Sequence, residues 1–296
     1  MDRREVLVML GAAGVAAAIL PERLYAAGTP DFGGARFAAT LADIDRRAPG
    51  RLGVAVLDFA TGQRFALRGG ERFPMCSTFK FPLSAAVLHA ADRGRLPLDR
   101  AVAVRRGDII ANSPVTARRV GGSMRVAALC HATMTTSDNA AANLLLPLIG
   151  GADGFNAFLR AAGDRVTRLD RIEPHLNEGT PGDPRDTTTP AAMLATMRAT
   201  LFGSVLSAAS RQRLIGWLVA NTTGGRRLRA GLPAGWRVGD KTGTGETSAN
   251  DIGVLWPRPG RAPILVASYL TEARGSQVRR YAVHAEVARA IAAAVR

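Results

Sequence analysis

The sequence predicts an α+β (α/β) protein of two domains, in which an antiparallel sheet flanked by helices is interrupted by an inserted all-helical domain. Alternating apolar residues typical of strands occur near both ends of the chain, at residues 52–58, 64–67, 251–256 and 264–270. From Cys76 to about Val219 the apolar residues instead recur at helical spacing. Strands from the two ends of the chain are therefore expected to share one sheet.

The first elements follow from local patterns. Phe37, Leu41 and Ile44 recur at helical spacing within residues 30–46, which predicts an amphipathic helix. A turn at residues 60–63, which contains a glycine, joins the first two strands as a hairpin.

The first 27 residues are typical of an export signal. Arg3 and Arg4 precede an uncharged run at residues 6–20, which is too short for a stable membrane anchor. Paired arginines before such a run favour twin-arginine export, and the localisation expected is periplasmic. The predicted organisation is an export signal at 1–27, a sheet-containing domain at 28–75 and 220–296, and a helical domain at 76–219.

Composition narrows the function classes. The chain is 47% hydrophobic and 21% charged, as expected of a globular protein, and its formal net charge is +15. Only 5% of the residues are aromatic and the arginines are spread along the chain, so we interpret the charge as solvated surface and not as a nucleic-acid site.

Ser77 and Lys80 form the strongest candidate for chemistry. Pro74 and the apolar run after Lys80 predict a buried helix with Ser77 in its first turn. The spacing of three residues places the hydroxyl and the amine on one helix face. Of the 39 lysine and arginine residues only Lys80 and Lys241 are lysine, and only a lysine can lose its proton at working pH. The sequence therefore places a potential nucleophile, Ser77, beside a potential base, Lys80.

Three further stretches carry candidate residues. Ser137-Asp138-Asn139 is a turn between two helical runs, and Glu173 lies in a loop rich in glycine and proline. Residues 241–245, Lys-Thr-Gly-Thr-Gly, are expected to form an exposed edge strand whose glycines let a substrate approach. A final helix is expected from about residue 281 to 295.

Metal and disulfide chemistry are not indicated. The four histidines and the two cysteines, Cys76 and Cys130, show no metal-ligand spacing, so neither a metal nor another cofactor is expected. At most one disulfide is possible.

In order, Ser-x-x-Lys, Ser-Asp-Asn and Lys-Thr-Gly resemble the signature of the class A β-lactamases. The resemblance implies that Ser77 attacks the β-lactam amide and forms an acyl-enzyme, with Lys80 and Ser137 moving protons. It also implies that Lys241 holds the substrate carboxylate and that backbone N–H groups of Ser77 and Thr244 bind the oxyanion. The other substrate-binding residues it implies are Asn139, Asn177, Arg227, Thr242 and Gly243.

Glu173 and Asn177 decide between branches of this wider family. In class A enzymes the corresponding pair positions a water that cleaves the ester, and Arg171 and Asp186 could pair across the neck of the loop, as the family's do. Penicillin-binding D,D-peptidases and covalent β-lactam sensors, the two alternatives, share the serine and lysine motifs. Whether Lys80 or Glu173 is the acylation base stays open.

Some positions depart from the family pattern. Gly245 and Ser84 occupy places where some members have the cysteine partners of Cys76 and Cys130, so both thiols are expected to be free. Asn112 replaces an aromatic residue often found at the cleft mouth. The partner expected is a small β-lactam, bound by a monomer without a stable membrane anchor after signal removal.

Overall fold

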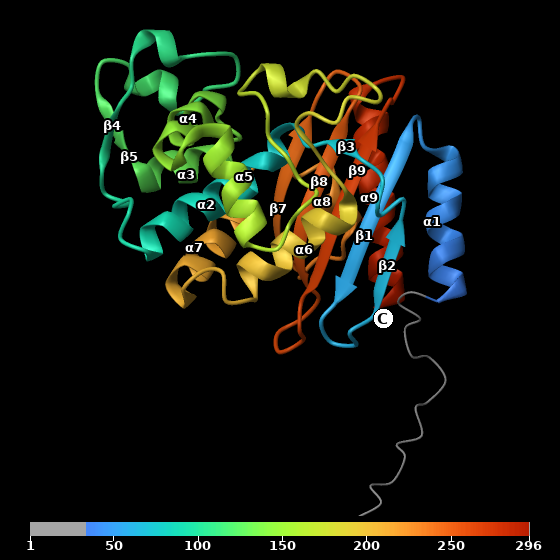
Figure 1. Cartoon of the computed structure of the whole chain (residues 1–296). Coiled ribbons are helices and arrows are strands. Elements are labelled where there is room, and N and C mark those ends of the chain that lie inside the picture. The colour runs from blue at the N-terminus through green and yellow to red at the C-terminus, as the bar shows by residue number, and fades with distance from the viewer. Residues whose placement is uncertain (1–33, 296) are drawn as a thin grey trace, which may run out of the picture.

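The computed structural model describes residues 34–295, which build a twisted sheet with helices on both sides (Figure 1). The sheet is antiparallel and has the strand order β2-β1-β9-β8-β7. Its strands are β1 (Arg51–Asp58), β2 (Arg64–Leu67), β7 (Arg237–Thr244), β8 (Ala249–Trp256) and β9 (Ile264–Thr271). Because β1 pairs with β9 along its whole length, the two ends of the chain share one sheet. The predicted fold class is confirmed.

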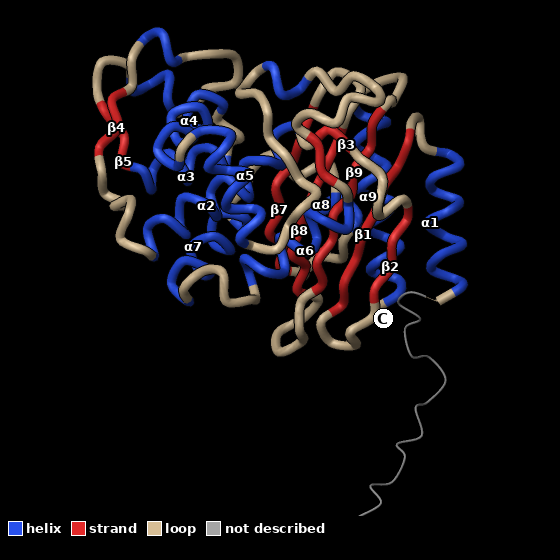
Figure 2. The backbone as a smooth tube through the Cα atoms, in the orientation of Figure 1, coloured by secondary structure: helices blue, strands red, loops and turns tan. Residues whose placement is uncertain are grey.

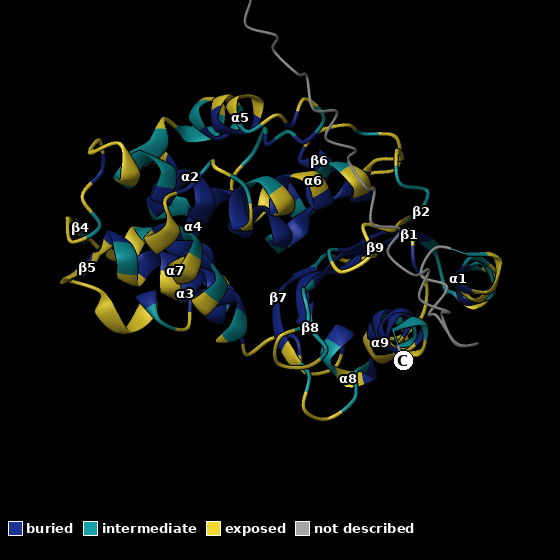
Figure 3. Ribbon diagram, turned by 90° about the horizontal axis from the view of Figure 1, so that it is seen from below, coloured by how far each residue is buried: buried dark blue, intermediate teal, exposed yellow. Residues whose placement is uncertain are grey.

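Both faces of the sheet are buried. Val54 and Val56 of β1 belong to a core with α1 (Ala35–Arg47) and α9 (Gln277–Ala294), whereas Ala55 and Leu57 belong to the core on the opposite face. This follows from the period of two along a strand. Figure 3 shows α1 and α9 on one side of the sheet and most other helices on the other side.

The middle of the chain supplies the larger core. Its helices pack with α6 against β1 and β9 and with α7 against β7. They are α2 (Lys80–Asp92), α3 (Val126–Thr135), α4 (Asn139–Leu145), α5 (Gly151–Ala161), α6 (Pro190–Leu201) and α7 (Ala208–Val219), followed by the short α8 (Leu228–Gly231).

Two short ladders lie outside the five-stranded sheet. One pairs β3 (Phe73–Pro74) with β6 (Thr187–Thr188), and the other pairs β4 (Ala101–Ala103) with β5 (Ser123–Arg125). Figure 2 shows β4 and β5 beside the helices and β3 beside the sheet. Strands of two or three residues are too short to show alternation, which explains why the sequence pattern does not reveal them.

Several predicted boundaries and exposures need correction. Ser77 lies in a 3-10 helix, η1 (Cys76–Phe79), and not in the first turn of α2. The last helix begins at Gln277, because the Ser276 hydroxyl accepts a hydrogen bond from the Arg279 N–H at 3.3 Å and caps it. Strand β7 is the edge strand, as predicted, but most of it is buried and not exposed.

The predicted export signal at residues 1–27, like the start of the predicted first helix at residues 30–33, lies outside the described residues. Within residues 34–295, no helix combines the length and the apolar character needed to cross a membrane.

His284 on α9 is expected to make the protein less stable in acid. Its ring bonds to the Ser268 hydroxyl at 2.8 Å and to the Ala249 carbonyl at 2.9 Å, and it is fully buried. Burial, aided by the charge of Arg227, lowers the pKa of His284 from 6.5 to about 3. The unfolded chain binds a proton first, so the free energy of unfolding should fall by about 1.4 kcal/mol per pH unit as pH drops from about 6.5 toward 3.

Urea unfolding of wild-type protein and of His284→Gln at about pH 7 and about pH 4.5 checks this expectation. The variant should show a shallower loss of stability, while His131→Gln, at an exposed histidine, should follow the wild type. Equal slopes for all three proteins would contradict the assignment.

Candidate active site

Ser77 and Lys80 meet at the junction of η1 and α2. The Lys80 ammonium donates a hydrogen bond to the Ser77 hydroxyl oxygen over 2.9 Å. Cys76, just before the serine, has φ of +44°, an uncommon conformation for a residue with a side chain. The backbone there turns sharply and the two side chains converge as their spacing predicts.

Lys80 is a central group of the site. Its Nζ also contacts the Ser137 carbonyl at 2.9 Å, Asn139 Oδ1 at 2.5 Å and Glu173 Oε1 at 2.9 Å. The side chain of Lys80 is completely buried. A buried ammonium needs such partners, because it has lost its hydration.

Glu173 faces the serine from the loop. Its Oε1 accepts a hydrogen bond from Ser77 Oγ at 3.2 Å, and its Oε2 accepts one from Asn177 Nδ2 at 2.5 Å. The backbone of Glu173 is held by Asn143, whose side chain donates to its carbonyl at 2.9 Å and accepts from its N–H at 3.1 Å. Asn143 was missed in the sequence, although it lies four residues after Asn139 and so on the same helix face.

Lys241 lies beneath the cleft. Its Nζ donates to Ser137 Oγ at 3.0 Å and to the Thr242 carbonyl at 2.8 Å, and its side chain is fully buried. Ser137 itself has φ of +58°. The two lysines therefore reach the same serine, since Lys80 Nζ is 3.4 Å from its hydroxyl oxygen.

Arg227 is buried behind β7. It donates to the Gly243 and Asn250 carbonyls at 2.8 and 2.5 Å and to the Thr244 hydroxyl at 2.5 Å. Its guanidinium lies 4.0 Å from the ring centre of Tyr281. Arg227 therefore holds Thr244 in place and also forms part of the cleft wall itself.

Gly243 lies at a close contact between β7 and η1. A Cβ at this position would lie 2.7 Å from the Met75 carbonyl oxygen and 3.2 Å from a Thr78 methyl group. Glycine is needed here because β7 packs closely on η1.

Burial sets the charge of both lysines. It lowers the pKa of Lys80, against the opposing effect of the Glu173 carboxylate. It lowers the pKa of Lys241 further below the usual range, helped by the charges of Lys80 and Arg227. Both amines are thereby shifted toward the neutral form that can accept a proton.

These residues surround a cleft of about 590 Å³, a size typical of small-molecule sites. Asn112 lies at its rim, exposed, and donates to the Ser137 carbonyl at 2.8 Å. Of the candidate residues, Lys80, Lys241 and Gly243 lie behind the walls. The cleft is lined by Ser77, Ser137, Asn139, Glu173, Asn177, Arg227, Thr242 and Thr244, with Thr223 and Tyr281 among others.

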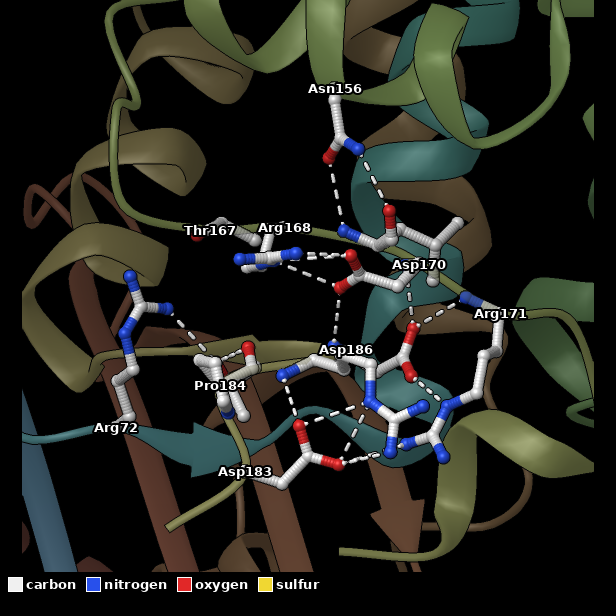
Figure 4. Close-up of polar contacts among 12 residues, drawn as sticks. Arg72, Asn156, Thr167, Arg168, Asp170, Arg171, Asp183, Pro184 and Asp186 are labelled. Atoms are coloured by element: carbon white, nitrogen blue, oxygen red, sulfur yellow. Dashed lines mark hydrogen bonds and ion pairs between the residues drawn. The ribbon is translucent and has the colours of Figure 1, made fainter.

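The carboxylate loop is closed at its neck by an ion pair (Figure 4). Asp186 accepts hydrogen bonds from Arg171 Nε at 2.6 Å and from the backbone N–H groups of Asp170 and Arg171 at 2.7 and 2.9 Å. Arg171 and Asp186 thus form the ion pair across the neck of the loop that the sequence suggests.

Asp186→Asn should loosen the loop, because Arg171 would lose its buried anionic partner. We expect the free energy of unfolding to fall by about 1.5–3 kcal/mol, the cost of losing hydrogen bonds to a charged group. Chemical denaturation measures this, with Asp43→Asn as the control, since Asp43 pairs with the exposed Arg46 and Arg47 on α1 and not with Arg171. Equal losses for the two variants would argue against a special role for the neck pair.

Both cysteines are free, as predicted, and the structure buries both. Burial raises the pKa of the Cys76 thiol to about 12, which keeps this neighbour of Ser77 protonated. Among residues 34–295 no three His, Cys, Asp or Glu side chains are grouped so that they could hold a metal ion.

Comparisons with known proteins agree on one family. A model of the β-lactamase enzyme family matches residues 36–295. β-Lactamase L2 of Stenotrophomonas maltophilia is 48% identical over 98% of this chain and 97% of its own length. β-Lactamase FAR-1 of Nocardia farcinica is 47% identical over 87% of this chain and 82% of its own length.

Solved structures give the same result. A reconstructed ancestral class A β-lactamase has a TM-score of 0.85 and 60% identity, and covers 86% of this chain and 98% of its own. A β-lactamase from Xanthomonas campestris has a TM-score of 0.84 and 52% identity over 86% of this chain and 96% of its own. The chain therefore belongs to the β-lactamase enzyme family, as a class A serine enzyme that hydrolyses the β-lactam amide through an acyl-enzyme.

Proposed function

We propose that Ser77 is the nucleophile of this hydrolysis. The supporting observation is the position of its Oγ, which is 2.9 Å from Lys80 Nζ and 3.2 Å from Glu173 Oε1. Oγ attacks the lactam carbonyl carbon and gives up its proton to a neighbouring base. The carbon–nitrogen bond then breaks, and the ring nitrogen takes a proton through the Ser137 hydroxyl, which contacts both lysines.

The rest of the proposed site binds the substrate. The backbone N–H groups of Ser77 and Thr244 stabilise the oxyanion, and the hydroxyls of Thr242 and Thr244 take the substrate carboxylate. Lys241 supplies positive charge beneath these hydroxyls, and Arg227 orients Thr244. Asn139 offers its amide to the substrate side chain from the cleft wall.

Glu173 and Asn177 are proposed to activate the water that cleaves the ester. Glu173 takes one proton from the water while the oxygen attacks the acyl carbon, and Ser77 Oγ leaves with a proton. Asn177 Oδ1 is buried and accepts no hydrogen bond from residues 34–295. It is therefore available to accept a hydrogen bond from the attacking water and so to orient it. A D,D-peptidase or a covalent sensor needs no such pair.

A stopped-flow trace with a chromogenic cephalosporin tests the assignment. Sustained turnover over many equivalents is expected, whereas one stoichiometric burst without further release would indicate a peptidase or a sensor. A trace in which Ser77→Ala keeps wild-type turnover would overturn the proposed nucleophile.

We also propose that the chain is exported to the periplasm as a monomer by the twin-arginine route. Arg3 and Arg4 before the apolar run support this proposal. Replacing both by lysine should leave the precursor in the cytoplasm, as judged by fractionation. Unchanged export of that variant would exclude the twin-arginine route.

A further inference from the structure

The segment from Arg100 to Arg125 carries an unusual charge. It holds six arginines against a single acidic residue, Asp108, and it contains no aromatic residue. All six side chains are exposed. They are Arg100, Arg105, Arg106, Arg118, Arg119 and Arg125, and with Val120 we call them the arginine lobe.

Backbone contacts bring these arginines together. Strands β4 and β5 pair so that Ala101 lies opposite Arg125. Val104 then exchanges two hydrogen bonds of 2.9 Å with the Gly121–Gly122 turn, which follows Arg119. Residues that are up to 25 positions apart therefore share one projection, which Figures 1 and 3 place at the end of the molecule opposite α1.

The charge of the lobe is not neutralised within the protein. Within the described part of the chain, none of the six side chains makes a hydrogen bond or an ion pair, whereas ten other arginines form ion pairs, among them Arg171 and Arg229. The one local acid, Asp108, accepts a hydrogen bond at 2.7 Å from the backbone N–H of Arg105. Like charges repel, so such a cluster is stabilised when an anionic partner approaches.

Val120 adds an apolar contact to this charge. It is 37% exposed and lies between Arg119 and the tip of the turn, and it is one of only four large apolar side chains that are at least 36% exposed in residues 34–295. Arginines around a protruding apolar side chain suit the boundary between lipid headgroups and acyl chains. Single-stranded nucleic acid, by contrast, is usually bound with the help of aromatic side chains, which this segment lacks.

We propose that the arginine lobe docks the enzyme reversibly on a bilayer surface that carries the phosphates of anionic lipids. The arginines contact the phosphates and Val120 enters the headgroup layer. Asn112, at the rim of the catalytic cleft, belongs to the same segment, so a docked molecule holds its cleft beside the membrane. Antibiotic that crosses the bilayer would then meet the enzyme as it leaves the lipid.

Co-sedimentation of the purified exported enzyme with vesicles tests this proposal. We expect binding to vesicles of phosphatidylcholine mixed with phosphatidylglycerol, weak binding to phosphatidylcholine alone, and release by salt. Changing Arg105, Arg106, Arg118 and Arg119 to Gln should weaken partitioning by about 5-fold per residue, and so by 10² or more together.

A control variant with the same net charge separates the lobe from a general charge effect. It replaces four exposed arginines outside the lobe by Gln, namely Arg36, Arg64, Arg165 and Arg289. Its fold-decrease in vesicle partitioning should be less than about a tenth of the fold-decrease of the lobe variant. Both variants should retain wild-type turnover of a soluble cephalosporin, which shows that they are folded. Equal losses in both variants, binding that resists salt, or a preference for RNA over the anionic vesicles would each overturn the proposal.

Discussion

Glu173→Gln is expected to convert the enzyme into a trap for its substrate. Glutamine has nearly the same shape but cannot take a proton from the attacking water, so hydrolysis of the ester should slow by about 10²–10⁴-fold. The substitution removes the ion pair with Lys80, but the oxygen that accepts from Asn177 and the backbone contacts with Asn143 remain available to a glutamine, so the loop should keep its position.

Formation of the ester should survive this change. Burial lowers the pKa of Lys80, and the charge of Glu173 is the largest effect that opposes it. Removing that charge favours the neutral amine, which can accept the Ser77 proton. Intact-protein mass spectrometry should therefore show a stoichiometric adduct, and stopped-flow absorbance a rapid burst followed by slow turnover.

Glu178→Gln provides the matched control for this experiment. Glu178 lies on the same loop and pairs with Arg171 at the surface, away from Ser77. This variant should turn over like the wild type and accumulate no adduct. If Glu173→Gln also shows no adduct, the glutamate is required before the ester forms and the assignment to deacylation is wrong.

Much of the architecture could be predicted because its signals are local. Short apolar runs mark β1 and β9 as strands, and Phe37, Leu41 and Ile44 mark the buried face of α1. The spacing from Ser77 to Lys80 sets their distance whether the backbone is an α-helix or a 3-10 helix, so the contact was predicted although the helix type was not.

What could not be predicted depends on contacts between distant segments. The burial of β7 arises from its packing on η1 and α7, which the sequence of β7 does not encode. Gly243 illustrates this, since a side chain at this position would collide with Met75 and Thr78, which are distant in the sequence. Asn143 also gains its role only when the loop of Glu173 folds over α4.

The distribution of the arginines over the surface also could not be predicted from the sequence. Along the sequence they are spread out, which predicts a solvated surface without a concentrated patch. The pairing of β4 with β5 concentrates six of them at one end of the molecule, while acidic residues neutralise others elsewhere. Net charge alone gives no information on such a distribution.

Lys80→Arg is expected to block formation of the ester and so to identify the base. Arginine keeps the positive charge but cannot lose its proton, and its planar group does not fit the compact set of contacts around Lys80 Nζ. If Lys80 takes the Ser77 proton, the burst rate should fall by about 10²–10⁴-fold. One observation favours Lys80: burial shifts its amine toward the neutral form, and a neutral Nζ, 2.9 Å from Ser77 Oγ, can accept the proton that Ser77 donates to Glu173 in this structure.

The pH dependence of the burst distinguishes a chemical role of Lys80 from a structural one. With Lys80 as the base, the burst rate of Glu173→Gln should rise with pH as the amine loses its proton, and Lys80→Arg should lack that rise. Lys241→Arg, which changes the other buried amine, should raise KM by a larger factor than it lowers the burst rate. The reason is that Lys241 is hydrogen-bonded to Ser137 and Thr242 and not to Ser77. A burst in Lys80→Arg within tenfold of wild type, together with its loss in Glu173→Gln, would assign the base to Glu173 instead, because the carboxylate would then be the one neighbour of Ser77 Oγ still able to take its proton.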